Sequence, residues 1–251
     1  MKGPVISPGY ARLLIIIGLL VLWEVGARVD GDPLFMSPPS DVAVALVGFL
    51  SDTAVLDAIR TTLYELVTAF LLAIVVGLPL GLVIGLQRFA RGSFYPIVLL
   101  LYAIPQATIL PLVILAFGIG PPSKIAFGFT HAVFPIIVTI VAGVQNMNPT
   151  LLTAARSMGA SRFQVFVNIV LPHMVPAFFT GMRLAMTADL IGVLLAELYV
   201  SQAGVGHYTR LFTESFQPAK LFAIVAALAA IAVCLNETFR RAERHMSRWH
   251  D

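Results

Sequence analysis

Three charged residues interrupt an otherwise apolar stretch, 174–200, in the second half of the chain: Arg183, Asp189 and Glu197. A charge at bilayer depth is costly, and it normally faces a partner or a water-filled cavity. Asp189 and Glu197 are eight residues apart, so a helix places them roughly on one side. Together with His131, these residues are candidates for lining a translocation pathway. The alternatives are a buried structural pair and, for His131, a hydrogen bond to a backbone carbonyl.

Patterns typical of enzymes are absent from the sequence. No glycine-rich loop ends in Lys-Ser or Lys-Thr, and there is no HExxH, CxxC or nucleophile-elbow pattern. The histidines are scattered, and Cys234 is the only cysteine, which excludes an intrachain disulfide. We therefore expect no catalytic residues, no metal site and no bound cofactor in this chain, and we interpret Cys234 as a packing residue.

The composition excludes a water-soluble globular protein. Of the 251 residues, 59% are hydrophobic and only 12% are charged, whereas about 25% charged residues is usual in soluble domains. Such a chain cannot cover itself with polar surface, so its solvent must be the lipid bilayer. In a membrane protein a net charge of +3 bears on orientation and does not indicate nucleic-acid binding.

About six segments are long and apolar enough to span the bilayer. For the first, a cleaved secretory signal peptide is the alternative, since Val25-x-Ala27 fits a cleavage site. Glu65, near the start of the second segment, is expected at the membrane interface, and Pro105 and Pro111 interrupt the third. The segments are Leu13–Trp23, Leu63–Leu86, Phe94–Phe117, Lys124–Val144, Met174–Val200 and Ala219–Phe239.

The second segment carries Gly77, Gly81 and Gly85, one every four residues. This spacing stacks the glycines on one helical face, where another helix can approach closely. Pro79 lies among them and is expected to kink the helix. Both a mobile packing seam and static close packing are consistent with the pattern.

The basic residues set the orientation of the spans. With both termini inside, ten lysines and arginines fall on the inner side and five on the outer side, which agrees with the excess of basic residues in cytoplasmic loops. This topology places 148–172 in the cytoplasm, and it places the polar segments 31–60, with a short helix at 42–50, and 201–218 outside. The inner residues are Lys2, Arg12, Arg88, Arg91, Arg156, Arg162, Arg240, Arg241, Arg244 and Arg248.

The stretch 148–172 has the signals of a short helical hairpin. Asn148-Pro149 is a helix start, Gly159 is placed to end that helix, and Ser161 can cap a second one. On the helical spacing, Leu151, Leu152, Ala155 and Met158 share one face of the first helix, and Phe163, Phe166, Val167 and Val170 share one face of the second. The alternative is a polar loop between two spans.

This hairpin resembles the cytoplasmic loop of permease subunits of binding-protein-dependent ABC importers. The family pattern is Glu-Ala-Ala, a Gly four residues later, and then Ile-x-Leu-Pro. The matching residues here are Thr153-Ala154-Ala155, Gly159, Ile169 and Leu171-Pro172, with Thr153 in place of the family glutamate. Segments on both sides resemble the nitrate, sulfonate and taurine branch, including Phe117-Gly118-Ile119-Gly120, Gly181-Met182-Arg183-Leu184-Ala185, Ala196-Glu197-Leu198 and Gly204-Val205-Gly206.

The resemblance implies an all-α membrane protein with the type I ABC importer permease fold and a short cytoplasmic coupling helix. It implies a core permease domain over 61–240, after an N-terminal helix and external segment at 1–60 and before a basic tail at 241–251. The residues expected to contact an ATPase are Leu151, Leu152, Thr153, Ala154, Ala155, Arg156, Met158 and Gly159. Those expected to contact an external binding protein are Gly204, Gly206, His207 and Tyr208.

The implied partners are two copies of an ATP-binding cassette ATPase that binds ATP and Mg, a second permease subunit forming a homodimer, and a periplasmic or lipid-anchored solute-binding protein. The solute implied is a small oxyanion such as a sulfonate, taurine or nitrate, with a vitamin or pyrimidine precursor or an aromatic carboxylate as the alternative. A stand-alone secondary transporter and a membrane scaffold are competing hypotheses. The former predicts inverted repeats, and the sequence shows no convincing repeat.

Overall fold

The computed structural model describes residues 8–29 and 31–246, and these residues fold into helices with no strand among them. Lys2 and Arg248, which contribute to the expected charge bias, lie outside the described residues. The helices are α1 (Pro8–Val29), α2 (Pro39–Phe49), α3 (Thr53–Leu86), α4 (Arg88–Ala103), η1 (Gln106–Ile109), α5 (Leu110–Phe117), α6 (Pro121–Gln145), α7 (Pro149–Ser157), α8 (Arg162–Val165), η2 (Phe166–Val170), α9 (Leu171–Val200), α10 (Val205–Glu214) and α11 (Pro218–Met246).

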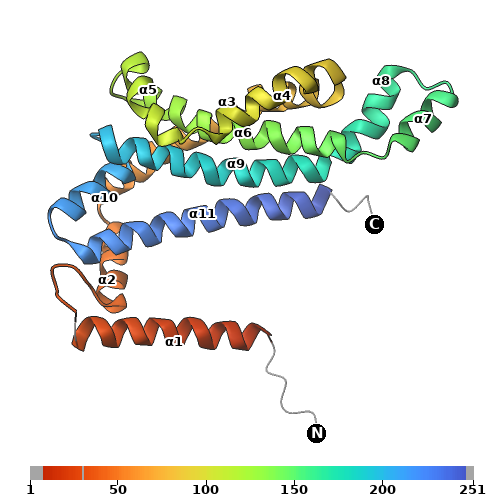
Figure 1. The fold of residues 1–251 in the computed structure, drawn as a ribbon. Coiled ribbons are helices and arrows are strands. Elements are labelled where there is room, and N and C mark those ends of the chain that lie inside the picture. Colours follow the sequence, from red (N-terminus) through yellow and green to blue (C-terminus); the bar gives the residue numbers. More distant parts are fainter. Residues whose placement is uncertain (1–7, 30, 247–251) are drawn as a thin grey trace, which may run out of the picture.

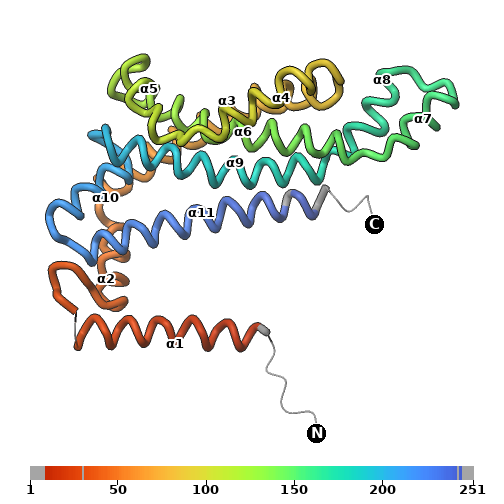
Figure 2. The backbone as a smooth tube through the Cα atoms, in the orientation of Figure 1, coloured from red at the N-terminus to blue at the C-terminus, as the bar shows by residue number. Residues whose placement is uncertain are grey.

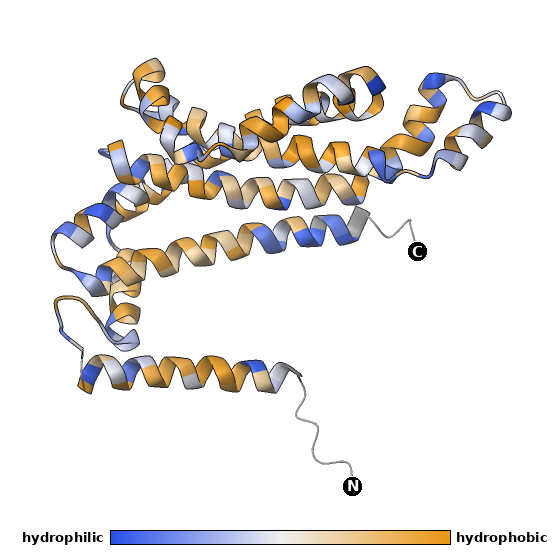
Figure 3. Cartoon of the chain, in the orientation of Figure 1, coloured by the Kyte–Doolittle hydropathy of each residue, from blue (hydrophilic) through white to orange (hydrophobic). Residues whose placement is uncertain are grey.

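The expected number of spans is confirmed. Five helices are long and apolar enough to cross a membrane, and the count is six if the pair Arg88–Ala103 and Gln106–Phe117, bent by 85°, forms one broken span. The break lies at Pro105, because the residue before a proline is disfavoured in the α-helical region and Ile104 is accordingly extended. The apolar side chains run along the long helices, and the polar ones gather near their ends (Figure 3).

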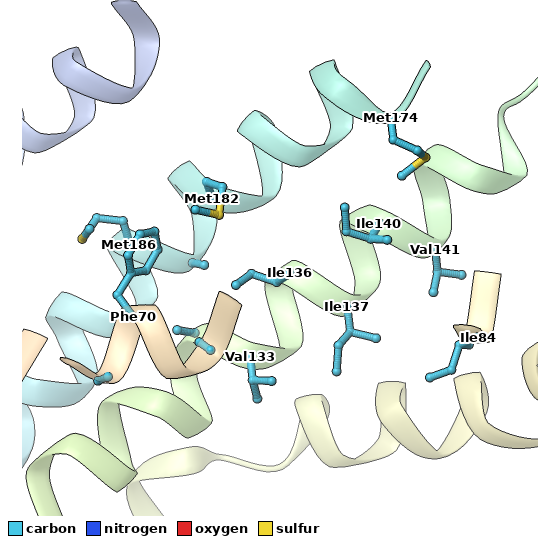
Figure 4. Close-up of a cluster of buried hydrophobic side chains, with 14 of the residues drawn as sticks. Phe70, Ile84, Val133, Ile136, Ile137, Ile140, Val141, Met174, Met182 and Met186 are labelled. Carbon is cyan, nitrogen blue, oxygen red and sulfur yellow. The ribbon is translucent and has the colours of Figure 1, made fainter. Parts of the chain in front are cut away.

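The core is built by α3, α6 and α9, which lie side by side along their length (Figure 1). Branched side chains of α6 fill the space between its two neighbours, and methionines of α9 close it from the other side (Figure 4). The buried side chains of this cluster include Phe70, Ile84, Val133, Ile136, Ile137, Ile140, Val141, Met174, Met182 and Met186.

The glycine stripe of α3 is the contact surface for α6, as expected. A Cβ added to Gly77 would lie 3.1 Å from Cγ2 of Ile136, and one added to Gly85 would lie 3.0 Å from Cβ of Val144. At Gly81 the added atom would lie 2.8 Å from Cβ of Ile140. α3 continues as a helix through Pro79. The absence of side chains thus lets two helices approach closely, which compensates for the weak drive to associate in lipid.

The two ends of the bundle carry different elements. The α7–α8 hairpin projects from the end where α1 begins and α11 finishes (Figure 2). The opposite end carries α10, α5 and the α1–α2 connection (Figure 1). The segment 201–218 was expected to be a polar loop. It contains a helix, α10, whose own residue Phe212 is buried.

Two features of α3 were not predicted from the sequence. The helix begins at Thr53, ten residues before the predicted start, because Asp52 caps it by accepting a hydrogen bond from the Ala54 backbone at 3.0 Å. Glu65 is fully buried within the chain, and its carboxylate accepts a hydrogen bond from the Lys124 ammonium at 3.0 Å. A lysine 59 residues away in sequence supplied the partner that the local pattern could not reveal.

The α3–α6 contact gives the first prediction. Gly81→Val would place a branched side chain against the Ile140 side chain, and such overpacking costs about 1–3 kcal/mol. At about 2–4 °C per kcal/mol, the melting temperature of the purified protein should fall by several degrees. The matched control is Gly92→Ala in α4, where an added Cβ meets nothing within 4 Å. Equal melting temperatures for the two variants would contradict this account of the contact.

Candidate functional site

The α7–α8 hairpin is held rigid by its own backbone and capping bonds. Asn148 begins α7 by accepting a hydrogen bond from the Thr150 backbone at 2.9 Å. Gly159 has a φ of 81°, the left-handed conformation that suits glycine, and the Ala160 N–H donates to the Ala155 carbonyl across this turn. Ser161 and Gln164 then form a reciprocal capping box that starts α8. Every helix start and stop expected from the sequence in this hairpin is present.

The apolar residues of α7 do not form the single face that was predicted. Leu152 and Ala155 pack inward against the core cluster, whereas Leu151 is 51% exposed and Met158 is 87% exposed. In α8, Phe163 is 75% exposed and points away from the core, which the predicted face of the second helix did not anticipate. Three large apolar side chains of the hairpin are therefore exposed, and we refer to them together as the exposed apolar surface Leu151–Met158–Phe163. Such patches mark interaction sites.

The remaining expected coupling residues are all exposed. Thr153, Ala154, Arg156 and Gly159 lie on the surface of the hairpin. The Thr153 hydroxyl donates to the Pro149 carbonyl at 3.1 Å, so the residue that replaces the family glutamate is engaged within its own helix.

A π-helical turn joins the hairpin to α9. The Leu171 N–H donates to the Phe166 carbonyl, five residues back. Pro172 follows and has no N–H to donate, so it cannot continue the regular α-helical pattern at this point. Single π-helical turns of this kind are frequent at functional positions. This turn is the chain connection between the hairpin and α9.

At the opposite end of the bundle, Glu197 holds the start of α10. Its carboxylate accepts hydrogen bonds from the Gly206 backbone at 2.7 Å and from the Thr62 hydroxyl at 2.7 Å, and it is fully buried. The Thr62 hydroxyl in turn accepts from the Val205 backbone at 2.9 Å. Gly204 has a φ of 93°, and a side chain there would overlap the Glu197 carboxylate. The Gly204-Val205-Gly206 motif is thus a cradle for a carboxylate of the same chain.

This arrangement changes the interpretation of the predicted external contact residues. Gly204 and Gly206 are buried in the cradle, so they offer no surface to a partner. His207 and Tyr208 are half-buried beside it. Arg210, which the sequence did not single out, donates to the carbonyls of Leu198, Tyr199 and Ser201 and so caps the end of α9.

The predicted pathway residues do not form one cluster. Arg183 is paired with Glu243 of α11 at 3.3 Å, near the hairpin end. Asp189 and Glu197 are both fully buried within the chain. His131 is half-buried, and its Nδ1 lies 2.9 Å from the Phe127 carbonyl of its own helix. A pathway enclosed between two subunits would be lined by residues exposed in each subunit, and neither carboxyl group meets that condition in this conformation.

Two contributors were missed because their signals are weak in sequence. Thr62 and Lys124 sit at the ends of different spans, and each becomes a partner of a buried carboxylate only when α3, α6 and α9 are packed. Phe163 was assigned to one face with Phe166, Val167 and Val170, and only its exposure in the folded hairpin shows that it belongs to the presented surface.

The chain matches the family described as the binding-protein-dependent transport system inner membrane component over residues 74–249. The taurine transport system permease protein TauC of Escherichia coli K12 is 30% identical over 237 residues, covering 92% of this chain and 86% of that protein. The nitrate import permease protein NrtB of Synechocystis sp. PCC 6803 is 27% identical, covering 90% and 84%. The formylaminopyrimidine transport permease protein ThiX of Halalkalibacterium halodurans is 26% identical, covering 94% of each.

Solved structures share the fold at lower identity. A chain of the MetNI methionine ABC transporter in an inward-facing conformation superimposes with a TM-score of 0.69 at 17% identity, covering 78% of this chain and 97% of that chain. A chain of a bacterial ABC transporter that imports alginate gives a TM-score of 0.66 at 17% identity, covering 96% and 94%. The expected type of fold is therefore confirmed. This chain belongs to the family of binding-protein-dependent permeases, the inner-membrane subunits of ABC importers.

Proposed function

We propose that this permease is driven by a separate ATPase that grips the α7–α8 hairpin, and that it imports a small oxyanion delivered by an external binding protein. The observation that carries the proposal is the exposed apolar surface Leu151–Met158–Phe163 on a rigid hairpin. It lies at the same end as Arg240, Arg241 and Arg244 in the last turns of α11 (Figure 1). Basic residues mark the cytoplasmic side, where ATP is available.

The contact with the ATPase is expected to depend on packing more than on charge. Two of the three large side chains at its centre, Met158 and Phe163, are more than two-thirds exposed in the isolated chain. Burying an apolar side chain of this size stabilises a contact by about 1.5–3 kcal/mol. Leu152 and Ala155 pack against the core cluster, so displacement of the hairpin would act on that cluster.

The proposed cycle uses two permease subunits, forming a homodimer around one pathway, and two ATPase subunits beneath them. ATP and Mg bind between the ATPase subunits and draw the two gripped hairpins together. The motion enters α9 through the π-helical turn at Phe166–Val170, and the pathway then opens outward to a periplasmic or lipid-anchored binding protein. Hydrolysis reverses these changes. No ATP, metal or catalytic group is assigned to the permease itself.

Two of the relatives support the choice of solute. The permease named for taurine import is 30% identical to this chain, and the one named for nitrate import is 27% identical. Taurine carries a sulfonate group, and nitrate is itself an oxyanion. The relative named for formylaminopyrimidine transport, at 26% identity, keeps a pyrimidine precursor as the second candidate. The half-buried His207 and Tyr208, beside α10, stay the predicted contacts of the binding protein.

The coupling role predicts the behaviour of Gly159→Val. A Cβ added to Gly159 meets nothing within 4 Å, so the substitution creates no clash. Its effect comes from the left-handed backbone, which costs a residue with a side chain roughly 1–2 kcal/mol. We expect the complex to assemble and hydrolyse ATP while uptake falls by about tenfold, equivalent to about 1.4 kcal/mol.

The control for this variant is Gly159→Asn, because asparagine tolerates the left-handed conformation. It should keep most of the uptake in proteoliposomes. Normal uptake by Gly159→Val would remove the hairpin from the coupling mechanism.

The solute proposal is tested with radiolabelled taurine as the probe. Proteoliposomes containing the permease, its ATPase and its binding protein should accumulate taurine only with ATP inside, and an excess of an alkyl sulfonate should compete. ATP-dependent accumulation of a formylaminopyrimidine in place of taurine would favour the second candidate. Accumulation driven by an ion gradient without any ATPase would refute the ATP-driven mechanism.

A further inference from the structure

Asp189 is a buried carboxyl group without partners. It is fully buried, and within the described part of the chain neither carboxyl oxygen has a hydrogen-bond partner. Its surroundings are apolar: a side chain at Gly128 of α6 would overlap Oδ1, and the side chains of Val193 and Ala69 border the same space. A buried polar group with no partner raises the energy of the conformation that contains it.

The same helix shows how a buried carboxylate is normally accommodated. Glu197, two turns further along α9, is equally buried, but it accepts hydrogen bonds from the Gly206 backbone and the Thr62 hydroxyl. The two acidic residues of α9 therefore have opposite relations to this conformation. Glu197 is satisfied by it, and Asp189 is not.

The contact between α6 and α9 that encloses Asp189 is made at two glycines, one on each helix. Gly128 of α6 faces α9, and Gly192 of α9 faces α6, where a side chain would lie 2.9 Å from the ring of His131 and 3.1 Å from the Gly128 Cα. The two backbones thus approach closely at these glycines, and the side chains of Val193 and His131 pack against them. His131 borders the contact, but its Nδ1 is directed at the Phe127 carbonyl.

The neighbouring α3–α6 contact is different. It is formed by Gly77, Gly81 and Gly85 against branched apolar side chains, and Val141 at that contact is fully buried. No titratable side chain takes part in the glycine contacts of this seam. The same two helices are joined by the buried Lys124–Glu65 ion pair at 3.0 Å, in which the second Glu65 carboxyl oxygen has no hydrogen-bond partner among the described residues.

We propose that α9 separates from α6 around Gly128 and Gly192 during the transport cycle, so that the Asp189 carboxyl group meets water, while α3 and α6 stay together. The proposal rests on the ATP-driven function above, because the hairpin and the π-helical turn lead directly into α9. An unsatisfied carboxyl group raises the energy of the closed contact relative to the open one, and it therefore shifts the population toward opening. Asp189 is a positioning residue that sets this balance.

The first test compares stability with transport for Asp189→Ala in the assembled permease–ATPase complex. Alanine removes the unsatisfied group and favours the helix, so the melting temperature should rise by about 2–4 °C. Uptake should nevertheless fall by about tenfold, within the range of conformational coupling in proteins. Glu197→Ala is the control of opposite sign, because it leaves the buried Gly206 N–H without its acceptor and should lower the melting temperature. Asp189→Ala with unchanged uptake, or with a lower melting temperature, overturns the proposal.

The second test detects the opening directly and does not depend on removing Asp189. Cys234, the only native cysteine, is first replaced in Cys234→Ser. Val193→Cys, beside Asp189, and Val141→Cys, at the α3–α6 contact, are then each treated with a water-soluble maleimide in proteoliposomes that contain the complete importer. Both valines are fully buried. We expect Mg-ATP to accelerate labelling of Val193→Cys by about tenfold and to leave Val141→Cys protected.

Equal labelling of Val193→Cys with and without Mg-ATP overturns the proposal, and so does equal acceleration at both positions. The same vesicles are assayed for ATP-driven uptake of taurine. If wild-type uptake is absent, the proposed function fails; if uptake is present and Val193→Cys stays protected, only the inference about α9 fails.

Discussion

The close approach of α3, α6 and α9 is the constraint on which the rest of the structure depends. Lipid tails are as apolar as the side chains of these helices, so association cannot rely on the hydrophobic effect and must come from packing at short range. Gly77, Gly81 and Gly85 provide that range on one side of α6, and Gly128 and Gly192 provide it on the other. The two contacts differ in their buried carboxyl groups: Glu65, beside the first, is paired with Lys124 through one oxygen, whereas neither oxygen of Asp189, at the second, has a partner among the described residues.

The packed helices determine what happens at both ends of the bundle. At one end they bring the Glu197 carboxylate, the Thr62 hydroxyl and the first N–H groups of α10 together, so that three separate segments satisfy one another. At the other end they support the inward side chains Leu152 and Ala155 of the hairpin. The outward side chains Leu151, Met158 and Phe163 stay exposed among the described residues, and exposed apolar side chains of this kind mark interaction sites.

Local signals in the sequence were sufficient wherever neighbouring residues decide the structure. The spans follow from the length of apolar runs, and the hairpin follows from Asn148, Gly159 and Ser161, whose backbone preferences act within a few residues. The glycine spacing of α3 also predicted a close helix contact, because residues four apart share a helical face. The glycine spacing did not predict which helix packs against these glycines, or whether the two helices move relative to each other. The family pattern in the hairpin predicted the fold type, which the family match and the solved relatives confirm.

The sequence by itself therefore determined that the chain lies in the lipid bilayer, how many segments can span it, that 148–172 forms a hairpin, and which family the chain resembles. Only the tertiary structure decided the roles of the polar residues inside the membrane. Glu65, expected at an interface, is paired with Lys124, and Gly204 and Gly206, expected to meet a partner, cradle Glu197. Asp189 lies on the same helix as Glu197, α9, but among the described residues its carboxyl group has no hydrogen-bond partner. The reason is physical: an ionisable group in lipid is governed by the partners within a few ångströms of it, and helix packing draws those partners from residues far away in sequence.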